Sequence, residues 1–173
     1  DIGRADTFEE FQERYLTAFG SRNMRQLLRQ LPTYMILDDH EIEDNWSQDR
    51  IRKAEHRLVF MQAIGAYMSY QWLHGPRNYG RQLFYDFDCR DYPFFVLDTR
   101  TQRYMDDVEA DLSDNQLLGR LSLAEEEPNQ LTYLLHWLKQ QQVKRGNAPK
   151  FVVTSSVFAP NPIDAREGRK SDN

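Results

Sequence analysis

Several classes of protein are excluded by what this sequence lacks. Its only cysteine, Cys89, can form no disulfide within the chain and has no neighbouring His or second Cys for a thiolate site, so we interpret it as structural. No apolar run reaches the roughly 18 to 20 residues of a membrane span. The opening stretch DIGRADTFEE lacks the basic and apolar regions of a signal peptide. The chain as given therefore predicts no membrane partner and leaves its localisation unknown.

Positive charge is also scarce. The formal net charge is -5 and the pI is near 5.4, whereas nucleic acids and anionic membranes bind clusters of Lys and Arg. No nucleic-acid partner is predicted. Clusters of acidic residues suit cations instead.

Apolar residues are frequent enough for one substantial core, because 40% of the 173 residues are hydrophobic. Their period changes along the chain between helix-like and strand-like, which indicates an α/β protein. Helices are expected at 7–20 with Thr7 as N-cap, at 24–31, from Ser47 or Asp49 to about His74, at the segment opened by Ser113, and at 129–142. Strands are expected at 33–37, 82–89, 92–97 and 150–158. Of these, 82–89 and 92–97 form a hairpin, and 33–37, 92–97 and 150–158 are expected in the interior of a sheet.

The stretch YMILDDHEIEDNW, Tyr34–Trp46, combines an apolar run with a dense acidic segment. Seven of the eight residues at 38–45 are polar, and five of these are carboxylates. Oxygen and nitrogen donors packed so closely repel one another unless a cation lies among them. A solvated loop whose acids cap the following helix is the alternative explanation.

Three of the expected strands end in polar residues. Leu37 precedes Asp38-Asp39-His40, Leu97 precedes Asp98-Thr99-Arg100, and Val153 precedes Thr154-Ser155-Ser156. In an open α/β sheet, ligands bind beyond the carboxyl ends of the strands. We therefore expect these three ends to lie close together in one site.

Two motifs resemble a known family. The segment LPTYMILDDHEIEDNW resembles the D-D-H-[DE] signature of the alkaline phosphatase D-like (PhoD-like) branch of the calcineurin-type metallophosphoesterases. The segment FFVLDTRTQR is similar to the family's L-D-T-R-x-x-R segment, which a Gln-Leu helix follows there as here. The resemblance covers roughly Phe8 to Pro160. It implies part of a β-sandwich flanked by helices.

The resemblance also implies a function, the hydrolysis of phosphate esters at a two-metal centre of Fe, Ca, Mn or Zn. Asp39 stands at the position of a metal ligand, with Asp38 and Asn45 as further candidates. His40 stands where a His contacts the substrate phosphate and assists the leaving group. Arg100 is a candidate for binding the phosphate, although an Arg that closes onto Asp98 or a helix end is equally compatible with the sequence. An acidic residue at the position of Glu41 commonly holds the neighbouring His or the loop.

The sequence departs from the family in three blocks. Ahead of the D-D-H-[DE] block it contains no D-x-[HC] strand and no G-D-x-x-Y segment, and after it no G-D-x-H block, and the sequence has no Gly-Asp pair at all. We therefore expect residues 1–160 to be a partial domain, the middle portion of a longer phosphatase, which is inactive alone. The metal pair is expected in the full-length parent, and a portion without bound metal is compatible with the sequence. Residues 161–173 are expected to be a loop or disordered tail. Apolar strand surface left uncovered in such a portion predicts self-association.

Two alternatives stay open. One is a non-catalytic metallophosphoesterase-like module that binds another protein. The other is an unrelated metal site built from Asp38, Asp39, His40 and Asp44.

Overall fold

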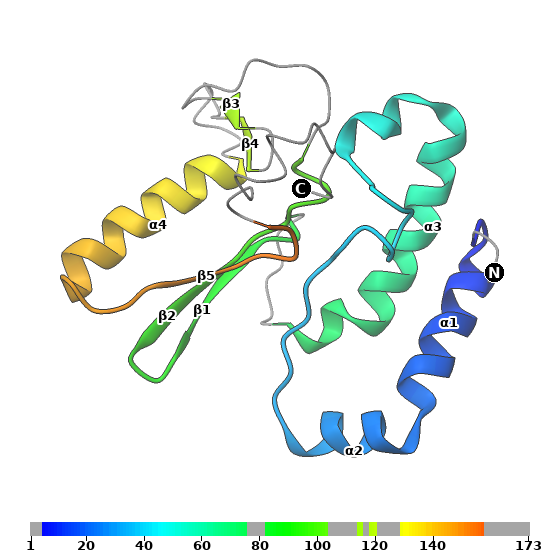
Figure 1. Ribbon diagram of the computed structural model, residues 1–173, viewed down its shortest axis with the longest axis horizontal. Helices are drawn as coiled ribbons and strands as arrows, with labels where there is room; N and C mark the ends of the chain where they lie inside the picture. Colours follow the sequence, from blue (N-terminus) through cyan, green and yellow to red (C-terminus); the bar gives the residue numbers. More distant parts are fainter. Residues whose placement is uncertain (1–4, 76–81, 104–113, 116–117, 121–128, 158–173) are drawn as a thin grey trace, which may run out of the picture. The chain divides into compact units, whose positions relative to one another are not determined.

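The structure is a computed structural model of the 173-residue chain, and it describes residues 5–75, 82–103, 114–115, 118–120 and 129–157. The chain divides into two compact units, Asp1–Trp46 with Arg50–Tyr79, and Ser47–Asp49 with Gly80–Asn173. In the described residues the first unit is helical, and the second holds two small sheets and one long helix (Figure 1). The predicted mixed α/β class is confirmed. None of the described helices has the length and apolar content of a membrane span.

The first unit opens with α1, Phe8–Gly20, which begins as predicted. The Thr7 hydroxyl accepts a hydrogen bond from the Glu10 backbone N–H, and the Glu10 carboxylate accepts one from the Thr7 N–H. This capping box satisfies donors that the first turn of a helix leaves without partners. The helix buries Phe11 and Tyr15 on one face. The next helix, α2 (Arg22–Gln30), ends before Pro32 as expected but buries no residue.

The long helix predicted from Ser47 or Asp49 to His74 is wrong in its extent. The segment consists of the 3-10 helix η1 (Gln48–Arg52), the α-helix α3 (Ala54–Tyr70) and the 3-10 helix η2 (Trp72–His74). Before α3 the backbone forms the three-residue hydrogen bonds of a 3-10 helix in place of α-helical ones. One example is the bond from the Lys53 N–H to the Arg50 carbonyl, at 3.1 Å. The α-helix therefore starts only after Lys53.

For this helix the sequence predicts an apolar stripe of Leu58, Met61, Ile64, Tyr67, Met68 and Trp72, and of these only Tyr67 lies in the buried face of α3. This face consists of Val59, Ala63, Ala66 and Tyr67, whereas Leu58 and Met61 are exposed. Small residues let α1 approach closely, and a side-chain carbon added at Gly65 would lie 3.6 Å from the Phe8 ring. Large apolar residues alone therefore did not mark the contact face.

The strand predicted at 33–37 is not observed. The segment leads into the acidic loop with Leu37 buried, but it pairs with neither of the two described sheets. A strand is defined by backbone pairing with a neighbour, which an apolar run does not by itself supply.

The second unit contains a three-stranded sheet in the order β1-β2-β5. Strand β1 (Tyr85–Cys89) and β2 (Tyr92–Val96) form the predicted antiparallel hairpin, and β5 (Phe151–Val153) lies parallel to β2. Strand β2 is central, as predicted for the FFVL run. Strand β5 was expected in the interior, but it is the outer strand of this sheet and all its residues are exposed. Cys89 is exposed at the end of the hairpin.

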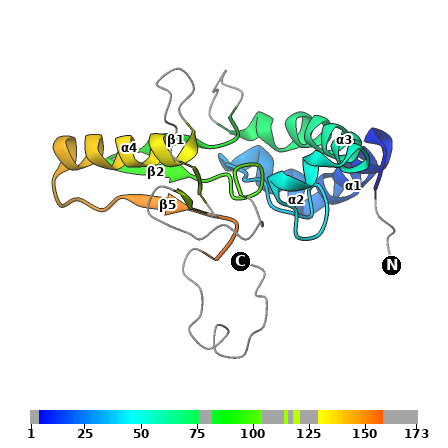
Figure 2. The same cartoon turned by 90° about the horizontal axis from the view of Figure 1, so that it is seen from above.

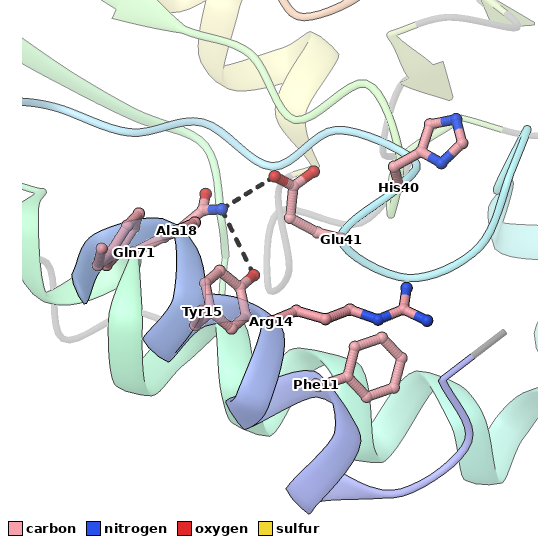
Figure 3. A pocket seen from close by; sticks show the side chains of 8 residues that line it. Phe11, Arg14, Tyr15, Ala18, His40, Glu41 and Gln71 are labelled. Carbon is pink, nitrogen blue, oxygen red and sulfur yellow. Dashed lines mark hydrogen bonds between the residues drawn. The ribbon is translucent and has the colours of Figure 1, made fainter. Parts of the chain in front are cut away.

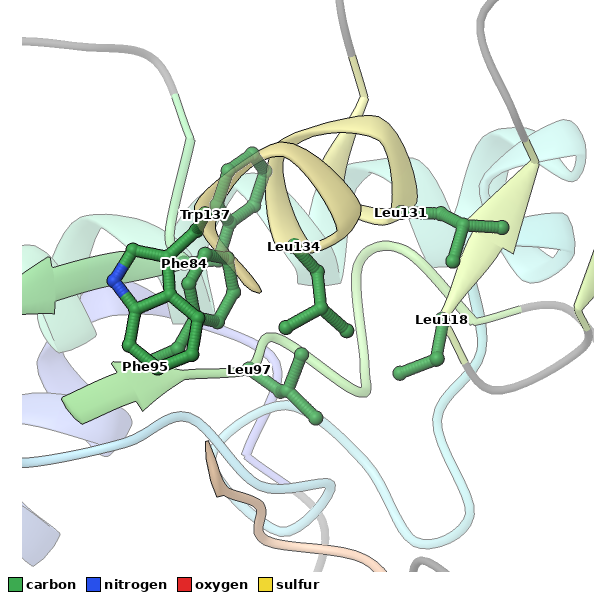
Figure 4. Close-up of a cluster of buried hydrophobic side chains, with 7 residues drawn as sticks. All are labelled: Phe84, Phe95, Leu97, Leu118, Leu131, Leu134 and Trp137. Carbon is green, nitrogen blue, oxygen red and sulfur yellow. The ribbon is translucent and has the colours of Figure 1, made fainter. Parts of the chain in front are cut away.

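Helix α4, Gln130–Arg145, covers one face of this sheet (Figure 2). Its Leu131, Leu134 and Trp137 are buried, and the Trp137 and Phe95 ring centroids are 5.4 Å apart. The apolar spacing of residues 129–142 predicts Leu131, Leu134, Leu135 and Leu138 inward, but Leu135 is 48% exposed. The core cluster, drawn in Figure 4, consists of Phe84, Phe95, Leu97, Leu118, Leu131, Leu134 and Trp137.

The short helix predicted from Ser113 is wrong for the described residues of that segment. Strands β3 (Asp114–Asn115) and β4 (Gly119–Arg120) pair there in an antiparallel ladder. Gly119 has φ +89°, which an α-helix does not permit. The β-sandwich stays a prediction, and the predicted tail at 161–173 lies outside the described residues.

Candidate active site

The acidic loop is organised by the buried side chain of Asp39. Its Oδ1 accepts a hydrogen bond from the His40 N–H at 2.8 Å, and its Oδ2 accepts one from the Asn45 N–H at 2.9 Å. Its carbonyl oxygen accepts bonds from the N–H groups of Ile42 and Glu43. Asn45 has φ +55°, a conformation that Asn tolerates better than most residues. One carboxylate thus closes the turn and fixes where the neighbouring side chains lie.

This turn brings three metal-binding side chains together. One ligand atom each from Asp39, His40 and Asp44 lies within 4.8 Å of the others, and His40 Nε2 is 3.4 Å from Asp44 Oδ1. Ligands on opposite sides of one cation are about 4 to 5 Å apart, twice a bond length of 2.0–2.4 Å. The spacing therefore fits one ion. Asp39 is buried, whereas His40 and Asp44 are exposed.

The other two predicted ligands do not belong to this cluster. Asp38 is half-buried, and its N–H donates to Glu41 Oε2 at 3.0 Å. Asn45 donates from Nδ2 to Asp44 Oδ2 at 3.1 Å, so it supports a candidate ligand. Residues 39–45 form turns and bends in which Asp44 folds back toward Asp39, so the order of residues along the chain does not give the ligand set.

Glu41 holds the loop in place, as expected. Besides the Asp38 N–H, its carboxylate accepts a hydrogen bond from Gln71 Nε2 at 2.9 Å. Gln71 Nε2 also lies 3.4 Å from the Tyr15 hydroxyl. Burial raises the pKa of Tyr15, and the Glu41 carboxylate raises it further, so this phenol stays protonated. The chain Glu41–Gln71–Tyr15 connects the loop to α3 and α1.

The end of the loop is fixed by residues that sequence reasoning missed. Trp46 is fully buried and stacks on Phe60 of α3, with ring centroids 5.5 Å apart. Glu43 Oε2 lies 2.9 Å from His56 Nδ1 and 3.6 Å from Arg50 Nη1. The Trp that directly follows the acidic run was the signal for this anchor, because an aromatic ring beside a polar loop commonly packs into the core.

A pocket lies beside the cluster. It has a volume of about 210 Å³ and is lined by residues of α1, the acidic loop and the C-cap of α3: Phe11, Arg14, Tyr15, Ala18, Phe19, His40, Glu41 and Gln71 (Figure 3). His40 therefore belongs both to the cluster and to the pocket wall.

In the second unit, two of the predicted strand ends meet. The Leu97 N–H donates to the Val153 carbonyl at 2.9 Å, and the Thr99 hydroxyl lies 2.9 Å from Ser155 Oγ and 3.0 Å from Ser156 Oγ. The placement of Asp38–His40 beside these ends stays a prediction.

Arg100 and Asp98 are both buried at this strand end. Asp98 Oδ1 accepts hydrogen bonds from the N–H groups of Arg100 and Thr101, and the Thr101 hydroxyl donates to Oδ2. Burial raises the pKa of Asp98, although these hydrogen bonds oppose the rise. The Arg100 side chain is only 3% exposed, and this burial is compatible with a structural role as well as with substrate binding.

Gln130 is a further residue that sequence reasoning missed. Its Oε1 accepts from the Asp98 N–H at 2.6 Å, and its Nε2 donates to the carbonyls of Asp98 and Leu118 at 3.0 and 3.3 Å. This fully buried amide ties the start of α4 to the end of β2. The sequence signal for this role was that Gln130 is a polar residue directly before the apolar residues that form the buried face of α4.

Comparison with known proteins identifies the family. A family model described as PhoD-like phosphatase matches residues 3–168. The chain belongs to the PhoD-like phosphatase family. No curated protein and no solved structure matches it. Membership in this phosphatase family, in which members are in general metal-dependent, gives the Asp39–His40–Asp44 cluster a chemical context.

Proposed function

We propose that this chain supplies part of the active site of a metal-dependent phosphoric ester hydrolase, a phosphatase or phosphodiesterase. The observation that carries the proposal is the cluster of Asp39, His40 and Asp44 within 4.8 Å in a PhoD-like chain. A bound cation of Fe, Ca, Mn or Zn would offset the negative charge of the phosphate ester during attack by water. Mixed oxygen and nitrogen donors do not select strongly among these metals.

Each residue has a proposed role. Asp39, His40 and Asp44 would hold the cation through one ligand atom each, and the other imidazole nitrogen of His40 would donate a proton or hydrogen bond to the leaving oxygen. His40 suits this role because its side chain is 78% exposed and lines the pocket, where a substrate can reach it. We also propose that Arg100 neutralises the negative charge of the substrate's phosphate group.

One cluster does not hold a metal pair. Three donors within 4.8 Å suit one ion, and a bridged pair needs several further fixed anionic donors. We therefore propose that the chain is the middle portion of a β-sandwich phosphatase of the calcineurin-type superfamily. By itself it should show no appreciable turnover of nitrophenyl phosphate with any added divalent metal.

Metal binding by the chain tests the proposal. We expect Mn²⁺ to broaden the amide NMR signals of residues 39–45, and we expect His40→Ala and Asp44→Asn each to weaken binding at least tenfold. Both side chains are at least 70% exposed, so these variants should fold normally. The matched control is Glu13→Gln, which removes an exposed carboxylate from α1 and should change nothing.

Asp39→Asn needs a stability measurement beside the metal titration. It removes one of the two acceptors that close the loop, which costs about 1–3 kcal/mol when the donor is buried. Binding of Mn²⁺ that is equally strong in the wild type, His40→Ala and Asp44→Asn would contradict the proposed site. Absence of any binding would favour the non-catalytic interaction module.

A further inference from the structure

The pocket beside His40 has a mainly aromatic wall. Phe11, Tyr15 and Phe19 follow one another at intervals of four residues, so their rings project from one face of α1. Phe11 is 3% and Tyr15 is 9% exposed, so the wall is part of the packed helix pair and not a set of mobile surface rings. Ala18, between Tyr15 and Phe19, leaves room above the helix surface.

The polar groups deep in the pocket bind one another. Gln71 bridges the Glu41 carboxylate and the Tyr15 hydroxyl, as the dashed lines in Figure 3 show. Arg14 and His40 are the other polar side chains that line the pocket. A ligand here meets flat apolar rings together with one guanidinium and one imidazole.

The volume limits the size of the ligand. Pockets for drug-sized molecules span about 300–1,000 Å³, and this pocket measures about 210 Å³. A single aromatic ring fits this space, and its face would stack on the half-buried Phe19. A large polar alcohol such as a sugar would leave its hydroxyl groups against apolar rings, which is unfavourable.

We infer that this pocket binds the alcohol part of the phosphate ester, and that the preferred substrates are esters of small aromatic alcohols. The inference rests on the proposed function, because His40 at the pocket wall would then act on the oxygen that joins this group to phosphorus. Arg14 attracts the negatively charged phosphate, and the rings of α1 hold the aromatic group.

Binding measurements test the inference without requiring turnover. Phenyl phosphate is titrated into the chain and followed by NMR shifts of residues in α1 and the acidic loop, with glycerol 2-phosphate as a probe of equal charge but polar alcohol. We expect phenyl phosphate to bind at least tenfold more tightly. Ala18→Leu, which fills the pocket from an exposed helix position, should weaken phenyl phosphate at least tenfold, whereas Thr17→Leu, the neighbouring exposed position outside the lining, should not.

A second variant separates the ring from the charge. Arg14→Gln should weaken phenyl phosphate severalfold and leave the binding of phenol unchanged. Equal affinity for the two esters, or equal effects of Ala18→Leu and Thr17→Leu, would overturn the inference. If one of these results is obtained while Mn²⁺ still binds at Asp39, His40 and Asp44, the inference about the substrate fails but the proposed function stands. Failure of the inference can therefore be distinguished from failure of the proposed function.

Discussion

At the scale of single residues, Asp39 combines two properties. Its carboxylate closes the acidic loop through two backbone N–H groups, and it also lies in the cluster with His40 and Asp44. The sequence offered a metal site and a loop whose acids cap the following helix as alternatives. The hydrogen bonds of Asp39 stay within the loop, and α3 begins after Lys53 without a side-chain cap, so capping of α3 by these acids is not observed. A carboxylate oxygen that accepts one hydrogen bond keeps a further lone pair, so closing the loop is compatible with holding a cation.

The candidate site could be predicted from the sequence only where its residues are neighbours along the chain. Asp39 and His40 stand in a recognisable motif, and both belong to the cluster. Asp38 and Asn45 were ranked above Asp44 because linear spacing does not show how a turn closes. Gln130 was missed for a related reason, since its partners lie 12 and 32 residues away along the chain.

Asp98 gives a prediction about pH. Its folded pKa is raised by burial above the unfolded value of about 3.9, so the folded chain binds more protons than the unfolded chain in the interval between the two. Asp98 therefore makes its full contribution to the free energy of unfolding below about pH 3.9, and this contribution decreases as the pH rises through the pKa of the folded state.

The test compares Asp98→Asn with the wild type. An amide can keep both backbone hydrogen bonds through Oδ1 and can donate to the Thr101 hydroxyl, but it does not ionise. We expect urea unfolding between pH 4 and 8 to show that the wild type loses stability relative to Asp98→Asn as pH rises. The exposed Asp91→Asn is the control. A difference between Asp98→Asn and wild type that is constant with pH would contradict the assignment.

At the scale of elements, helices with local signals were predicted best. The Thr7 cap and the Asn129 cap both lie where polar residues precede an apolar period. Elements that depend on distant partners were predicted worst: residues 33–37 lack pairing in the described sheets, and the apolar β5 is an outer strand. Strand identity depends on neighbours that the local pattern does not specify.

The β1–β2 turn supplies a prediction about this hairpin. Arg90 has φ +54°, a left-handed conformation that costs a non-glycine residue about 1–2 kcal/mol. Arg90→Gly should remove this strain, and after about 0.4–1 kcal/mol of added unfolded-state entropy the net gain should be about 0.5–1 kcal/mol in urea unfolding. Asp91→Gly, at the adjacent turn position without a positive φ, should instead destabilise the chain. A loss of stability in both variants would show that strain at Arg90 is absent.

At the scale of the whole molecule, α4 covers only one face of the sheet. On the opposite face, Phe94 stacks between Phe87 and Phe151, with ring centroids 5.0 and 4.8 Å apart. Phe151 and Val153 on this face are 41% and 37% exposed. Apolar β surface next to an outer strand is a common site of association between chains.

A second copy of the chain is the occupant we predict for this face. Light scattering should show dimers or larger species whose fraction rises with concentration, because pairing two such faces removes the exposed rings and the outer strand from water. Val153→Lys places a charge on the face and should shift the population to monomer. Val143→Lys makes the same change on α4, where the side chain is 85% exposed and lies outside the core cluster, and should leave association unchanged. A wild-type chain that stays monomeric at high concentration would show that its own segments protect the sheet. Association that persists equally in both Lys variants would place the contact on another surface.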